Sequence, residues 1–297
     1  MLPAKSTKPS TLITESNCIH SDFLLGLGPH GFHRLHYTEW GSRNNPNVIF
    51  CVHGLTRNSR DFDRVASKLA GRYRVICPDM PGRGLSDWLV HCSDYNLTLY
   101  MADIVALLAR SGVEKIDWLG TSMGGLIGLL IAAQPNSPIK RLLLNDIGPC
   151  ISERSRHRIM EYLGRDPRFP NLASLEDYIR RIHAPFGPLS DAQWHHLAKH
   201  SAKKIDNGYA LHYDPGIADG FKNLASATTS LWPVWDALKC PVKVFRGSNS
   251  DLLSATTAAE MANRGPKAEI TEFPGIGHAP ALMSEDQITA VIEWFNP

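Results

Sequence analysis

The chain has 297 residues, which is long enough to bury one large core, so we expect a single domain with an insertion. Hydrophobic residues make up 43% and charged residues 20%, an ordinary globular composition that excludes a disordered or coiled-coil chain. The net charge is +2, from 31 basic and 29 acidic residues mixed along the chain, so no basic block is available to bind nucleic acid.

Neither a membrane span nor a secretory signal is indicated. The longest apolar runs, such as 126–133, are much shorter than the roughly 20 residues that cross a bilayer. Residues 1–18 lack the apolar stretch of a secretory signal, and we expect a flexible tail. The cysteines are scattered without metal-ligand spacing, which favours a reducing, cytoplasmic location. We expect a small-molecule substrate and no nucleic-acid or membrane partner, with monomer and homodimer both open.

Short β-rich runs alternate with amphipathic stretches of ten or more residues, a pattern typical of a parallel sheet with helices on both faces. The sequence predicts strands at Arg34–Trp40, Val48–Val52, Arg74–Cys77, Ile116–Leu119, Arg141–Leu144, Val242–Arg246 and Glu269–Phe273. It predicts helices at Asp61–Ala70, Thr98–Ser111, Met123–Ala133, Ala255–Asn263 and Glu285–Phe295.

The alternation stops between residues 148 and 239, where the chain becomes charged, aromatic and helical, with no strand pattern. We expect this segment to be a helical cap inserted after the sixth strand, over the carboxyl ends of the strands, where ligands of such sheets bind. The core is then 19–147 and 240–297. Cap helices are predicted at Ser152–Leu163, Leu175–Ile182 and Asp191–Lys203.

The most informative motif is Gly-x-Ser-x-Gly at residues 120–124, because an apolar strand runs directly into it and a helix of small residues follows. A strand that turns sharply into a helix needs small residues two positions before and two after the central one, which explains Gly120 and Gly124. Such a turn holds the Ser122 hydroxyl above the sheet, beside the positive end of the helix. The motif predicts Ser122 as a nucleophile.

With this motif the chain resembles the α/β-hydrolase fold enzymes over nearly its whole length after residue 30, and the resemblance implies a catalytic triad in the chain order Ser, Asp, His without metal or cofactor. The segment 48–55 resembles the family's strand and His-Gly turn, which implies that the backbone N–H groups of Leu55 and Met123 form the oxyanion hole. His53 is expected to hold this loop rather than act as a base; substrate binding is its alternative role.

The glycine-rich loop Asp79–Asp87 resembles the family's Asp-x-x-Gly-x-Gly-x-Ser loop, and we expect it to be structural. It lacks the full glycine spacing of phosphate-binding loops, which disfavours a nucleotide site.

Two aspartates compete for the role of triad acid. Asp251 ends a small-residue loop after the strand Val242–Arg246, the usual position in the family, and is preferred. Asp146 ends the preceding strand and is the alternative, because some members of the fold take their acid from there. His278 stands in a tight glycine-rich turn after the last strand, and the resemblance implies that it is the general base.

Three other features have open interpretations. Arg57, close to the oxyanion loop, is a candidate anchor for a substrate carboxylate, or a solvated loop cation. His196 and His200 have the i, i+4 spacing that can share a metal, but without further ligands in pattern we favour a polar helix face. The cap aromatics, such as Trp194 and Phe221, are expected to pack the cap and form the pocket wall.

The sequence therefore predicts a serine hydrolase that cleaves a small-molecule carboxylic ester through Ser122, His278 and Asp251 and an acyl-enzyme. Lactonase, amidase and C–C bond hydrolase are the alternatives, because this scaffold hosts all of them. Serine at the elbow disfavours the dehalogenase and epoxide-hydrolase branches, which have aspartate there. A non-catalytic binding protein of the same fold is the competing class, and it is disfavoured because every triad member has a candidate.

Overall fold

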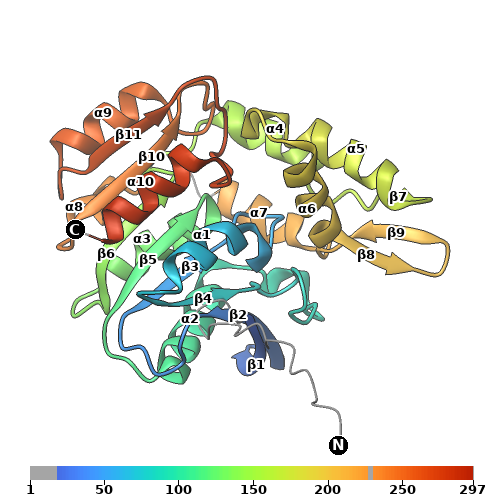
Figure 1. The fold of residues 1–297 in the computed structure, drawn as a ribbon, viewed down its shortest axis with the longest axis horizontal. Coiled ribbons are helices and arrows are strands. Elements are labelled where there is room, and N and C mark those ends of the chain that lie inside the picture. The colour runs from blue at the N-terminus through green and yellow to red at the C-terminus, as the bar shows by residue number, and fades with distance from the viewer. Residues whose placement is uncertain (1–18, 227–229, 297) are drawn as a thin grey trace, which may run out of the picture.

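The computed structural model describes residues 19–226 and 230–296. The predicted flexible tail, 1–18, lies outside the described residues. The two largest parts of the fold are an eight-stranded sheet with helices on its faces and a group of smaller elements beside one end of the strands (Figure 1).

The central sheet is mostly parallel, as predicted. Its strand order is β1-β2-β4-β3-β5-β6-β10-β11, in which β1–β2 and β2–β4 are antiparallel and all other pairs are parallel. The inner strands are fully buried apolar runs, as strands covered on both faces should be. The strands are β1 (Ile19–Gly28), β2 (Gly31–Trp40), β3 (Val48–Val52), β4 (Arg74–Pro78), β5 (Ile116–Thr121), β6 (Ile139–Asn145), β10 (Val242–Gly247) and β11 (Glu269–Phe273).

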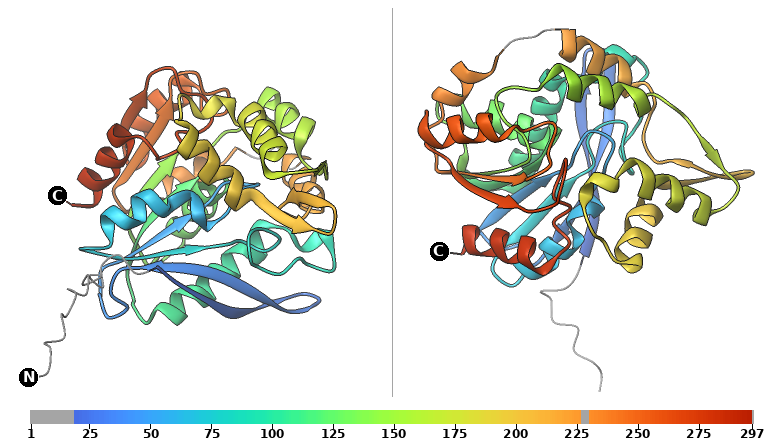
Figure 2. Two further views of the ribbon diagram at one scale, coloured as in Figure 1. Left: turned by 45° about the vertical axis from the view of Figure 1, so that its right-hand side comes forward. Right: turned by 90° about the horizontal axis from the view of Figure 1, so that it is seen from above.

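Helices cover both faces of this sheet (Figure 2). On one face α1 (Asp63–Leu69) packs against α10 (Glu285–Phe295), and on the other α2 (Leu97–Ser111) and α8 (Trp232–Asp236) flank α3 (Met123–Ala132). Helix α9 (Ala255–Asn263) connects β10 to β11.

Strand β1 is absent from the sequence prediction because its largely exposed side chains do not show the apolar pattern of a buried strand.

The segment between β6 and α8 forms the cap, and its predicted lack of strands is wrong. It contains a three-stranded antiparallel sheet in the order β7-β9-β8. The predicted helix Asp191–Lys203 ends at Ser201, because a hairpin with the loop Asp206–Asn207 follows and Gly208 takes a φ of 120° there. The cap elements are α4 (Glu153–Tyr162), β7 (Arg168–Phe169), α5 (Leu172–Ile182), α6 (Asp191–Ser201), β8 (Ala202–Ile205), β9 (Gly208–Leu211) and α7 (Ile217–Ser226).

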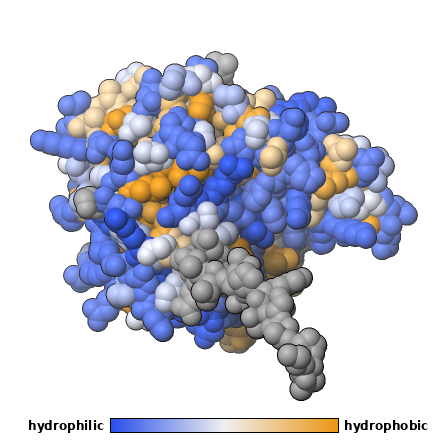
Figure 3. All heavy atoms as spheres, viewed as in Figure 1, coloured by the Kyte–Doolittle hydropathy of each residue, from blue (hydrophilic) through white to orange (hydrophobic). Residues whose placement is uncertain are grey.

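The surface in the view of Figure 3 is largely hydrophilic, with hydrophobic residues in several smaller areas. Among the described residues, no helix combines the length and the apolar character that crossing a bilayer requires.

Candidate active site

Ser122 lies at a strained bend between β5 and α3. Its φ of 51° and ψ of −113° are unusual for a non-glycine residue and bring its hydroxyl out of the strand. A Cβ on Gly120 would lie 2.4 Å from the backbone carbonyl carbon of Gly124, and one on Gly124 would lie 2.0 Å from the carbonyl oxygen of Val52. Both glycines are therefore required by close backbone contacts, as the motif predicts.

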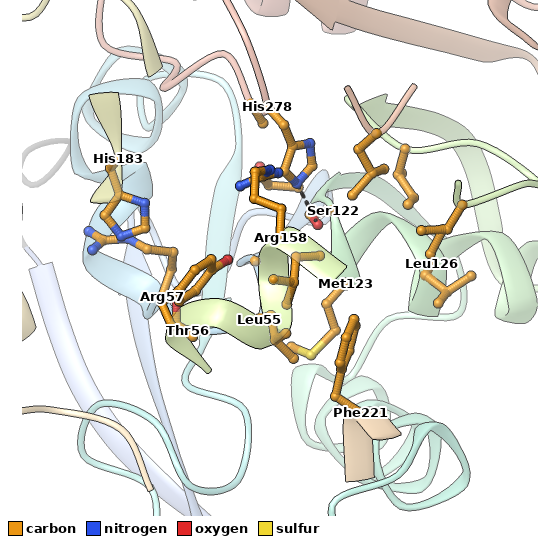
Figure 4. A pocket seen from close by; sticks show the side chains of 18 of the residues that line it. Leu55, Thr56, Arg57, Ser122, Met123, Leu126, Arg158, His183, Phe221 and His278 are labelled. Carbon is orange, nitrogen blue, oxygen red and sulfur yellow. Dashed lines mark hydrogen bonds between the residues drawn. The ribbon is translucent and has the colours of Figure 1, made fainter. Parts of the chain in front are cut away.

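His278 lies between Ser122 and an aspartate. It stands in the loop between β11 and α10, and its Nε2 is 2.9 Å from Ser122 Oγ (Figure 4). Its Nδ1 is 2.7 Å from Asp146 Oδ2, so the carboxylate accepts the Nδ1–H proton and leaves Nε2 to accept from the serine hydroxyl. Three residues from distant parts of the chain thus form one hydrogen-bonded series.

The preference for Asp251 as the partner of His278 is wrong. The Asp251 side chain turns toward the cap, where Oδ2 lies 2.5 Å from Arg158 Nε and Oδ1 lies 3.0 Å from Nη2. Asp146, the alternative, contacts the imidazole instead. The two strands that precede these aspartates are paired neighbours, so both carboxylates emerge at the same edge of the sheet, and only their side-chain partners separate them.

The buried Asp146 carboxylate has three donors. Besides His278, it accepts from Ser250 Oγ at 2.6 Å and from the backbone N–H of Gly247 at 3.1 Å. A buried carboxylate needs such partners, because each unpaired oxygen would be costly. The end of β10 and the loop that was expected to supply the acid therefore each supply a group that holds Asp146, and Ser250 was not among the predicted site residues.

Asn145, also missed by the sequence analysis, connects the loops of the site. Its Nδ2 donates to Thr121 Oγ1 at 3.0 Å and to the carbonyl of Pro280 at 2.9 Å. It thereby joins the residue before Ser122 to the loop that carries His278. Three apolar residues precede it in β6, and that context suggests only a strand end.

Leu55 and Met123 line the same pocket as Ser122 and His278. Met123 is the first residue of α3, so its N–H is one of the donors that a helix leaves free at its start. His53 does not line this pocket. Its Nδ1–H donates to the Gly54 carbonyl at 2.7 Å, and its Nε2 accepts from the Met80 N–H at 2.9 Å, so both ring nitrogens hold the loop.

Burial lowers the pKa of His53 to about 4. Since the folded state keeps this imidazole neutral, its contribution to stability is full above the unfolded pKa near 6.5 and is lost as the pH falls toward 4. Because of His53, we expect the free energy of unfolding to fall by about 3 kcal/mol when the pH is lowered from 7 to 4. Urea unfolding of wild type and His53→Asn at both pH values measures this; equal pH dependence of the two proteins would contradict it.

The glycine-rich loop after β4 is structural, as predicted. Asp79 is buried and accepts from the N–H groups of Ser59 at 2.7 Å and Leu85 at 2.9 Å and from His36 Nδ1 at 2.7 Å. Burial alone would raise the pKa of Asp79, but the hydrogen bond and charge of His36 outweigh it, and the pKa lies below its usual value. This carboxylate therefore holds the loop between the sheet and Ser59.

The pocket around Ser122 is mostly apolar, with cations in its wall. Arg57 contributes to the wall, but its guanidinium binds Asp61 through Nε at 2.9 Å and Nη2 at 2.6 Å, and its Nη1 donates to Ser201 Oγ at 2.7 Å. Arg57 is buried and joins the core to the end of α6, so it is not the solvated loop cation of the alternative interpretation. The apolar part of the wall includes Leu126, Ile147, Ile151, Ile159, Ile182, Phe186, Phe221 and Leu252.

His196 and His200 lie near Asp63 of α1, with one potential ligand atom from each within 4.8 Å of the others. This proximity was not predicted. His196 Nε2 lies 2.9 Å from the carbonyl oxygen of Arg60, and the Arg60 guanidinium binds both oxygens of Asp63. His196 thus joins the cap to the core, and the His200 ring lies beside it with the two ring centroids 4.6 Å apart.

The fold and this arrangement define the class of the protein. Residues 47–280 match the family model of the alpha/beta hydrolase fold, and the chain belongs to that family of hydrolases. It is 43% identical to the 3-hydroxybutyrate-oligomer hydrolase of Cupriavidus necator over 92% of this chain and 97% of that protein. It is 27% identical to an esterase of Mycobacterium tuberculosis over 86% of this chain and 83% of that protein.

Solved structures resemble this fold closely. An alpha/beta hydrolase from Novosphingobium aromaticivorans superimposes with a TM-score of 0.84 at 37% identity, over 93% of this chain and 98% of that one. A putative hydrolase from Rickettsia typhi gives 0.85 at 32% identity, over 93% and 98% of the two chains.

Proposed function

We propose that this protein is a serine esterase that hydrolyses short oligoesters of hydroxy acids, of which 3-hydroxybutyrate oligomers are the model. The observation that carries the proposal is the hydrogen-bonded series Ser122, His278, Asp146, which opens into a largely apolar pocket. The 43% identity to a 3-hydroxybutyrate-oligomer hydrolase over nearly the whole of both chains supports the substrate class.

In the acylation step, His278 Nε2 removes the Ser122 proton as Oγ bonds to the ester carbonyl carbon. The backbone N–H groups of Leu55 and Met123 stabilise the negative charge on the carbonyl oxygen. Asp146 stabilises the imidazolium that has formed. When the intermediate collapses, the carbon–oxygen ester bond breaks, His278 gives its proton to the leaving alkoxide, and the acyl group remains on Ser122.

In deacylation, a water molecule repeats these steps. His278 accepts a proton from the water molecule while the water oxygen attacks the acyl carbon. His278 then gives this proton to Ser122 Oγ as the carboxylic acid leaves. The apolar wall suits the methyl and methylene groups of a hydroxybutyrate chain, because it removes them from water.

Incubation of the purified protein with the dimer and trimer of 3-hydroxybutyrate, followed by chromatography, tests the substrate class. We expect 3-hydroxybutyrate as the final product, with each cleavage of the trimer giving one dimer and one monomer first. A panel of a p-nitrophenyl ester, a lactone, an amide and a C–C substrate distinguishes the other chemistries. The p-nitrophenyl ester is an activated ester that reports esterase activity in general. Faster cleavage of the lactone, the amide or the C–C substrate than of both oligomers would overturn the proposed substrate.

A further inference from the structure

Arg158 lies in the part of the pocket wall that separates the pocket from an outer depression. It projects from α4 of the cap and lines the pocket that holds Ser122 and His278 (Figure 4). It also lines a separate outer depression together with Glu153, His157, Glu161 and Asp251. The ion pair between Arg158 and Asp251 therefore lies between the catalytic pocket and the surface.

The guanidinium of Arg158 is only partly engaged. Its Nε and Nη2 donate to Asp251, and among the described residues no hydrogen bond from Nη1 is observed. The two side chains are 29% and 27% exposed, so Asp251 can regain water if it leaves. The buried Arg57, with its partners Asp61 and Ser201, has no comparable freedom.

The cap helix does not depend on this ion pair for its position. The carbonyl oxygen of Asp251 accepts from Ser155 Oγ at 2.6 Å, and Ser155 is fully buried. Ile159, one residue after Arg158, is buried in the main core. A change of partner at the Arg158 side chain therefore leaves α4 in place.

We propose that Arg158 binds a carboxylate of the substrate, and that this carboxylate replaces the Asp251 side chain on the guanidinium when the substrate enters. The proposal rests on the esterase function above and makes the substrate class narrower: an ester that carries a free carboxylate near the scissile bond, as the terminal unit of a hydroxy-acid oligomer does. Ile151 and Leu252 line the same pocket and reduce its polarity, which strengthens a charge-assisted, two-point contact.

Steady-state kinetics on matched substrates tests this inference. The 3-hydroxybutyrate dimer is compared with its methyl ester, which lacks the negative charge, and only cleavage of the ester between the two units is followed, because the methyl ester group is itself hydrolysable. In Arg158→Gln, kcat/KM for the dimer should fall by about 10- to 100-fold, mainly through KM, while the methyl ester is unaffected. Arg168→Gln removes the same charge from an exposed cap position outside the pocket and should change neither substrate.

Asp251→Asn should have the opposite effect, because it removes the carboxylate that competes with the substrate carboxylate for Arg158. The ratio of kcat/KM for the dimer to that for its methyl ester should rise several-fold. Equal losses for both substrates in Arg158→Gln, no loss for the dimer, or a fall of this ratio in Asp251→Asn would each overturn the proposal.

A protein that cleaves no ester would contradict the esterase function but would still allow a test of the carboxylate site. Calorimetric titration with 3-hydroxybutyrate should then show binding to wild type that is weakened in Arg158→Gln. Equal or absent binding to both proteins would reject the site.

Discussion

Replacement of Ser122 by alanine should lower kcat for ester hydrolysis by about 10⁶-fold, because residues of a triad act as a unit and the remaining groups cannot form an acyl-enzyme. KM should change little, since the hydroxyl contributes little to binding the ground-state ester. The strained φ of 51° at this position remains accessible to alanine, as it is to serine, so the fold should be retained. Single-turnover kinetics with a p-nitrophenyl ester measures the loss.

Ser93→Ala is the matched control. It deletes the same hydroxyl from an exposed position outside the pocket and should retain wild-type turnover. Circular dichroism and thermal unfolding show whether Ser122→Ala is folded. A folded Ser122→Ala protein with turnover near wild type would show that another group performs the attack.

Asp146→Asn should lower kcat by about 10⁴-fold with little change in volume. The asparagine oxygen can still accept from Gly247 N–H, which places the amide NH₂ toward His278 Nδ1. The imidazole then carries its proton on Nε2 and cannot accept one from Ser122. The pH profile of kcat should change with this variant, because the base is present in the wrong tautomer.

Asp251→Asn is the control for this prediction, because it makes the same change one strand away. On a neutral ester it should keep kcat within about tenfold of wild type, as expected for a partly exposed ion pair. The reverse pattern, with Asp251→Asn inactive and Asp146→Asn active, would restore Asp251 as the triad acid despite its contact with Arg158.

Much of the core could be predicted because local pattern and tertiary role agree there. Val48–Val52 is apolar throughout and buried on both faces, so its sequence pattern and its burial both indicate an inner strand. The structure of the cap was harder to predict from the sequence. Its hairpin depends on the turn Asp206–Asn207 before Gly208, a signal that is easily overlooked after a strongly helical segment. Strand β1 is an exposed edge strand, and no periodic pattern distinguishes it.

The site shows the same division. Ser122 and His278 stand in local turns, and the glycines beside them in the sequence indicate these turns. The choice between Asp146 and Asp251 depends on tertiary contacts: Ser250 and Gly247 hold one carboxylate toward the imidazole, and Arg158 from the cap draws the other away. Both aspartates follow neighbouring parallel strands, so spacing along the chain cannot separate them. The Arg158–Asp251 ion pair likewise joins residues that lie 93 positions apart in the sequence.

Labelling with a fluorophosphonate, followed by peptide mass spectrometry, tests the central claim most directly. The account predicts one covalent adduct per chain on the Ser122 hydroxyl, formed by wild type and absent from Ser122→Ala and His278→Ala. Folded wild-type protein that stays unlabelled, or an adduct on another residue, would contradict the assignment of Ser122 as the activated nucleophile.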